Sequence, residues 1–134
     1  MSYTPQYKTF TMDKTALFYA CSVYYLAFAI FHIGFWRLFN WTIELKKLSF
    51  TNRAVMQILN LRIIFMCFLM AFIYFKFPQE LMSSALGKTL LIGMGLFWAG
   101  RTVEQFVFFK HNNKYIVLTT CIFIVGTVLH FLCV

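Results

Sequence analysis

The chain has 134 residues, of which 61% are hydrophobic and only 12% are charged. Soluble domains have roughly a quarter of their residues charged, so this composition argues against a soluble globular domain. The net charge is +8, but the basic residues stand beside apolar runs and form no separate basic module. This placement argues against nucleic-acid binding and favours topology signals and contact with lipid headgroups.

Long apolar runs account for most of the chain, and each is close to the ~20 residues that a helix needs to cross a bilayer. We therefore predict an all-α polytopic membrane protein, with four transmembrane helices in an antiparallel bundle with short loops. The whole chain, residues 1–134, forms a single domain in this prediction. The four spans are expected at about residues 16–41, 54–75, 86–109 and 115–134.

The first span carries one face with helical spacing and ends in an aromatic and basic anchor. Trp36, Arg37 and Trp41 are typical of a membrane–water interface. The expected inner face consists of Cys21, Tyr25, Phe28, Ala29, His32 and Trp36. A basic loop, residues 42–53, follows and leads into the second helix.

The second span begins after Thr51 or Asn52, either of which can cap a helix N-terminus. Phe77-Pro78 is expected to end this span. One face is more polar than the rest and is predicted to turn inward; it consists of Arg53, Gln57, Asn60, Ile64, Cys67 and Ala71.

The third span is unusual because it holds Arg101, Glu104 and Gln105 inside an apolar run. A charge within hydrocarbon costs a few kcal/mol or more, so these side chains are expected to face protein or a water-filled cavity. Arg101 and Glu104 lie about one helical turn apart and can pair. Two flanks of small residues, Gly95–Ala99–Thr102 and Gly93–Gly100, predict close neighbours on both sides, as in the interior of a bundle.

A basic turn, residues 110–114, precedes the last span, in which His130 is expected near the membrane surface. Lysine and arginine are richer in the loops at 42–53 and 110–114 than near the termini. The positive-inside rule therefore predicts that these loops are cytoplasmic and that both termini are non-cytoplasmic.

With this orientation, polar side chains from different spans fall in the cytoplasmic half at similar depth, given a rise of ~1.5 Å per residue. The candidate functional cluster consists of His32, Gln57, Asn60, Arg101, Glu104 and Gln105. Arg101–Glu104 is either a structural ion pair or an anchor for an anionic headgroup or substrate with Glu104 as acid or base. His32 is a general base, a ligand or a hydrogen-bonded core residue, and Asn60 and Gln57 are interhelical hydrogen-bonding groups.

No catalytic motif is present in the sequence, so it leaves open whether the protein is an enzyme. The four cysteines form no C-x-x-C pair, and no metal or other cofactor is expected. We predict a non-enzymatic bundle: a subunit, an assembly factor or a lipid-binding protein. The alternatives are a membrane enzyme or enzyme subunit acting on a lipid-phase substrate, and a small oligomeric transporter or channel. The expected partners are the lipid bilayer and a possible homo- or hetero-oligomer, and no family resemblance is recognised.

Overall fold

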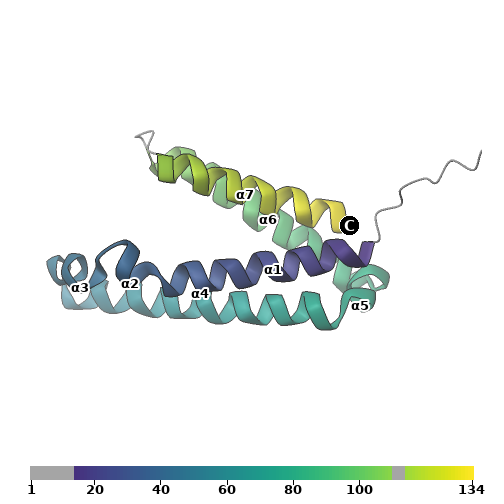
Figure 1. Cartoon of the computed structure of the whole chain (residues 1–134), viewed down its shortest axis with the longest axis horizontal. Coiled ribbons are helices and arrows are strands. Elements are labelled where there is room, and N and C mark those ends of the chain that lie inside the picture. The colour runs from purple at the N-terminus through teal and green to yellow at the C-terminus, as the bar shows by residue number, and fades with distance from the viewer. Residues whose placement is uncertain (1–13, 110–113) are drawn as a thin grey trace, which may run out of the picture.

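The computed structural model describes residues 14–109 and 114–134, and every regular element in these ranges is a helix (Figure 1). This result confirms the all-α class. The elements in chain order are α1 (Lys14–Ile33), α2 (Phe35–Leu38), α3 (Trp41–Glu44), the 3-10 turn η1 (Leu45–Lys47), α4 (Phe50–Lys76), α5 (Pro78–Ser83), α6 (Ala85–Phe108) and α7 (Lys114–Cys133).

The long helices form two antiparallel hairpins. In the first hairpin α1 packs along α4, and in the second α6 packs along α7. Figure 1 shows the α6–α7 hairpin inclined to the α1–α4 hairpin, with the end of α7 near the start of α1. The link between the hairpins is the contact of α1 with α7, together with the packing of α5 on α6. The described residues therefore do not form the closed four-helix bundle that the sequence predicts.

Three helices are long and apolar enough to cross a membrane, namely α1, α4 and α7. This finding supports a multi-pass membrane protein, but with three candidate spans where the sequence analysis predicts four. The remaining long helix, α6, has 24 residues. It contains Lys88, Arg101, Glu104 and Gln105, whose polarity offsets the apolar residues around them.

The first span is shorter than predicted, because the regular helix is interrupted at Gly34. The backbone carbonyl of Gly34 accepts from both Arg37 N (3.0 Å) and Leu38 N (2.9 Å). Just before this point, the carbonyl of His32 accepts from the Asn60 side-chain amide, at 3.0 Å. The chain changes direction at Asn40, between α2 and α3. Asn40 adopts a left-handed conformation with φ 49°, which asparagine tolerates better than most residues.

The helix ends follow local chemistry that the sequence analysis identified only in part. Ser49 caps α4 by accepting from Asn52 N at 3.4 Å. The prediction that Thr51 or Asn52 is the cap is therefore wrong. Ser84 caps α6 in the same way, accepting from Gly87 N at 2.9 Å. The second span ends before Pro78 as predicted, and Pro78 then starts the short helix α5, where its missing N–H is tolerated.

The buried core lies where the two hairpins meet. Part of the predicted inner face of α1 is confirmed, because its members Cys21, Tyr25, Phe28 and Ala29 are buried. The outward faces of the helices carry many exposed large apolar side chains. Of the two small flanks on α6, only one is covered. A Cβ at Gly95 would lie 3.0 Å from the Phe131 ring, whereas a Cβ at Gly93 or Gly100 would meet nothing within 4 Å. The α6 helix therefore has one open side and is not in the interior of a bundle.

Candidate functional site

His32 and Asn60 form a two-bond clamp between α1 and α4. Their side chains meet at 2.8 Å between Nδ1 and Oδ1, and Asn60 Nδ2 donates to the His32 carbonyl at 3.0 Å. Because the Asn60 Oδ1 only accepts, His32 Nδ1 carries the proton, and a neutral His32 ring keeps its lone pair on Nε2. The ring also stacks on Phe35, with centroids 4.3 Å apart. The clamp holds His32 rigidly in one tautomer.

Arg101 and Glu104 pair along one face of α6, with Nη1 and Oε2 3.2 Å apart. The Arg101 guanidinium also lies over the Phe123 ring of α7, 4.9 Å from its centroid, in the arrangement of a cation–π contact. The two side chains are nevertheless 34% and 55% exposed. Arg101 thus has an ion-pair partner and an aromatic contact and Glu104 has an ion-pair partner, but neither side chain is fully covered.

The two amide side chains of the predicted cluster have different surroundings. Gln105 is buried and donates to Thr119 Oγ1 at 2.9 Å, which ties α6 to α7. Gln57 is half-buried and lines a pocket at the far end of the α1–α4 hairpin, together with Trp36 and Trp41. Gln105 thus connects two helices, whereas Gln57 faces a hollow.

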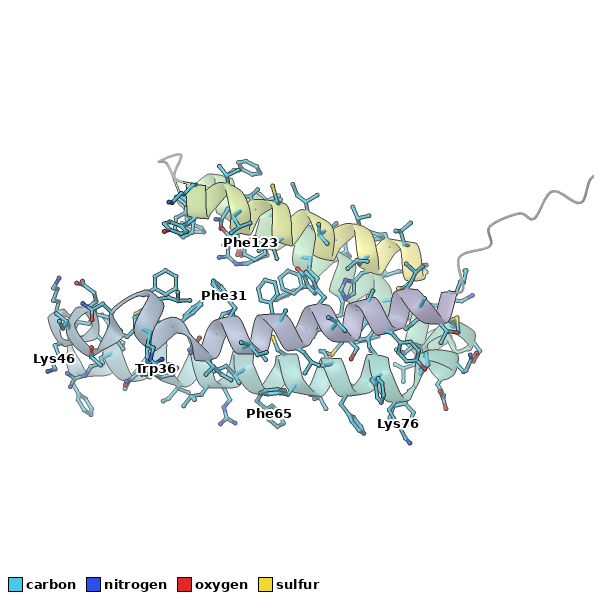
Figure 2. All side chains as sticks on the ribbon, viewed as in Figure 1. Phe31, Trp36, Lys46, Phe65, Lys76 and Phe123 are labelled. Carbon is cyan, nitrogen blue, oxygen red and sulfur yellow. The ribbon has the colours of Figure 1, made fainter. Side chains whose placement is uncertain are left out.

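The structure divides the predicted cluster between the two hairpins. Across the two described ranges, no hydrogen bond or ion pair joins Arg101, Glu104 or Gln105 to His32, Gln57 or Asn60. Phe31 on α1 and Phe123 on α7 lie on the facing sides of the hairpins in this region (Figure 2). The polar groups of the two hairpins do not bond to one another, because the helices that carry them belong to different pairs.

Between the hairpins, α1 and α7 line an apolar groove of about 390 Å³. Tyr24, Phe28 and Phe31 form its α1 side, and Thr119, Ile122 and Val125 lie on α7. The Tyr24 hydroxyl donates to the Ile122 carbonyl at 2.9 Å and marks the place where the two helices touch. The walls of the groove are almost entirely apolar and present few polar groups to anything that would lie in it.

A second polar cluster lies where α1, α6 and α7 meet, and the sequence analysis missed it. Tyr25 Oη and His130 Nε2 are 2.8 Å apart, and Trp98 Nε1 donates to the same hydroxyl at 3.2 Å. His130 Nδ1 lies 2.6 Å from the Gly126 carbonyl. A carbonyl only accepts, so Nδ1 carries the proton, and Tyr25 donates to Nε2 of the neutral ring. The direction of every bond in this network is thereby determined.

This second cluster is closed to its surroundings. His130 is 0% exposed, so its side chain is buried between the helices. Cys21 and Cys133 face each other beside it, with their sulfurs 3.8 Å apart. Tyr74 packs its ring against Tyr25 and His130, and its buried hydroxyl has no hydrogen-bond partner within the described chain.

One sequence signal could have revealed this cluster. The sequence analysis followed charged and amide side chains, and it treated tyrosines as apolar. Tyr25 was already placed on the inner face of the first span. Counting its hydroxyl as a polar group would have made it a candidate partner for a polar side chain of another span.

No group of three or more histidine, cysteine, aspartate or glutamate side chains that could hold a metal ion occurs within residues 14–109 and 114–134. No family model, curated protein or solved structure matches this chain. The functional argument therefore depends on the geometry alone.

Proposed function

We propose that this chain is a small multi-pass membrane protein that acts as a non-enzymatic subunit. In this proposal α6 is a fourth membrane crossing, and its open face is covered by α6 of a second copy. The end that carries α2, α3 and η1 faces the cytoplasm and both termini lie on the other side, following the distribution of basic residues.

The packing of α6 supports its role as a fourth crossing. It lies antiparallel along α7, which is a candidate span. Its 24 residues extend ~36 Å, enough for a hydrocarbon core of ~30 Å. Its outward side chains are apolar and exposed, as lipid contact requires, and include Leu96, Val103 and Phe106.

The observation that carries the subunit proposal is the open charge on this helix. The Glu104 side chain is 55% exposed, and a charge left in contact with lipid is unfavourable. Gly93 and Gly100 lie on the same side of α6 and meet nothing within 4 Å. A helical glycine costs up to ~1 kcal/mol relative to alanine, and small residues allow another helix to approach closely in lipid. Another helix on this face would explain both features.

A second copy fits this face because the face complements itself. A two-fold axis along the membrane normal would bring two α6 helices together in parallel. Arg101 of each copy would then lie near Glu104 of the other, since the two residues have opposite charge and lie one turn apart. The glycines would lie at the centre of the contact. The dimer would cover the charges that one chain leaves exposed.

The test is the mass of the purified protein, measured by native mass spectrometry from a mild detergent. We expect a dimer for the natural sequence and mostly monomer for Gly100→Leu, because the added side chain separates the two helices. The single chain has open space at Gly100, and leucine favours a helix more than glycine does, so the thermal stability of the single chain should not fall. Ala20→Leu, at an exposed small residue of α1, is the control and should remain dimeric. A monomeric natural protein, or a dimeric Gly100→Leu variant, would refute the proposal.

A paired substitution separates a structural role of the charges from catalysis or transport. Glu104→Gln should raise the dimer dissociation constant about tenfold, since polar contacts between membrane helices average ~0.6 kcal/mol and the two-fold axis forms this contact twice. Glu104→Gln also leaves the Arg101 charge without its partner, which should lower the yield of folded protein. Combining it with Arg101→Met removes that charge and should recover much of the folded yield. A well-folded double variant that loses a defined cellular phenotype would instead favour the lipid-phase enzyme or the transporter.

A further inference from the structure

A second hollow lies at the far end of the α1–α4 hairpin, away from the α6 face. This pocket has a volume of about 330 Å³ and is formed by α2, α3, η1 and the start of α4. Trp36, Trp41, Lys46, Arg53 and Gln57 line it. Figure 2 shows Trp36 and Lys46 at this end of the molecule.

The lining of this pocket is rich in hydrogen-bond donors and positive charge. Lys46 and Arg53 supply two cations, and no aspartate or glutamate lines the pocket. The neighbouring Lys47 differs, because it is paired with Glu44 at 2.7 Å. Arg53 has only a cation–π contact with Phe50, at 5.8 Å. The charges inside the pocket are therefore available to an anion.

The uncharged donors of the pocket also lack partners. Within the described ranges, neither the indole N–H groups of Trp36 and Trp41 nor the Gln57 amide takes part in any of the side-chain hydrogen bonds. Trp41 is 8% exposed as a residue, and its N–H is not among the fully buried groups that lack a partner. These unpaired donors line the pocket and can bond to a ligand that carries acceptor oxygens.

The position of the pocket points to a lipid as the source of those oxygens. It lies at the shared end of α1 and α4, both candidate spans. Tryptophan is typical of the headgroup level of a membrane, where anionic phospholipids also attract lysine and arginine. The lining also includes the apolar side chain of Leu45, beside the basic residues.

We propose that this pocket binds the phosphate of an anionic phospholipid headgroup. Arg53 and Lys46 neutralise the phosphate, and the Gln57 amide and the tryptophan N–H groups donate to its oxygens. Guanidinium and ammonium groups form short, charge-assisted hydrogen bonds with phosphate. This site is independent of the α6 face, so a monomeric protein could still contain it.

The experiment measures lipid retention by the full chain in native mass spectrometry. The probes are phosphatidylglycerol and phosphatidylcholine with the same acyl chains, and glycerol 1-phosphate as a soluble competitor. We expect selective retention of phosphatidylglycerol, and a loss of about thirtyfold in its affinity in the Lys46→Gln/Arg53→Gln variant. The soluble phosphate should compete poorly, because it lacks the acyl chains that hold the lipid at this depth.

A matched control separates a site from general surface charge. Lys47→Gln/Arg62→Gln also removes two positive charges from the same hairpin, but neither residue lines the pocket. This variant should keep its selectivity for phosphatidylglycerol. Gln57→Leu changes no charge and should weaken binding several-fold. Equal losses in both double variants, no effect of Gln57→Leu, or full competition by glycerol 1-phosphate would each overturn the proposal.

Discussion

The two ends of this molecule treat their polar side chains differently. Where the hairpins meet, Tyr25, Trp98 and His130 join three helices through directed hydrogen bonds. Toward the other end, His32 and Asn60 bond within one hairpin, while Arg101 and Glu104 stay on the other. The first end is closed, and the second leaves charge and a donor-rich pocket open.

This difference shows that polar side chains that are predicted to lie at one level need not bond to one another. The closed end converges because α1, α6 and α7 are in contact there, as Trp98 lies between Tyr24 and Phe123. At the open end each hairpin satisfies its own groups, and the remaining groups face outward. We therefore expect the closed end to determine stability and the open end to determine binding.

The largest effect should come from Trp98→Ala at the closed end. Trp98 is 4% exposed, and its ring lies 4.7 Å from that of Phe28. Removing a buried tryptophan usually costs ~3–5 kcal/mol of unfolding free energy. Phe106→Ala, at an exposed aromatic of the same helix, should change it by less than ~0.5 kcal/mol. Unfolding in a detergent series measures both, and equal losses would show that Trp98 is not a core residue.

Tyr25→Phe should have a smaller effect on the same cluster. It leaves the Trp98 N–H and His130 Nε2 without partners, which costs ~1–3 kcal/mol. Tyr74→Phe is the matched control, because it removes a buried hydroxyl that bonds to nothing among the described residues. That variant should be neutral or slightly more stable. If the two variants were equally destabilised in thermal unfolding, the assigned hydrogen-bond network would be wrong.

The smallest of these effects is expected at the open end, for Asn60→Leu. The substitution keeps the side-chain volume and removes two hydrogen bonds to His32. Such bonds contribute ~0.6 kcal/mol each in membrane proteins, so a loss of ~1 kcal/mol is expected. Leu61→Ala, at an exposed neighbour, provides the baseline for the same unfolding measurement. A loss larger than that of Tyr25→Phe would reverse the comparison between the two ends.

Several features could be predicted from the sequence because they depend on neighbouring residues. Helical spacing correctly placed Cys21, Tyr25 and Phe28 on one buried face. Pro78 ended its helix as expected. The error at the Ser49 cap is a shift of two or three residues, whereas α1 ends at Ile33, eight residues earlier than predicted. The interruption at Gly34 lies beside a contact from another helix, since the Asn60 side chain donates to the His32 carbonyl.

The sequence by itself determined the helical class, the presence of helices long and apolar enough to cross a membrane, and the buried face of α1, because length, apolar content and helical period are local properties. Only the tertiary structure decided which helices pair, and therefore which polar groups meet. Tyr25 and His130 are 105 residues apart, and no spacing rule relates them. Their contact depends on the pairing and tilt of whole helices, which the packing of many side chains sets together.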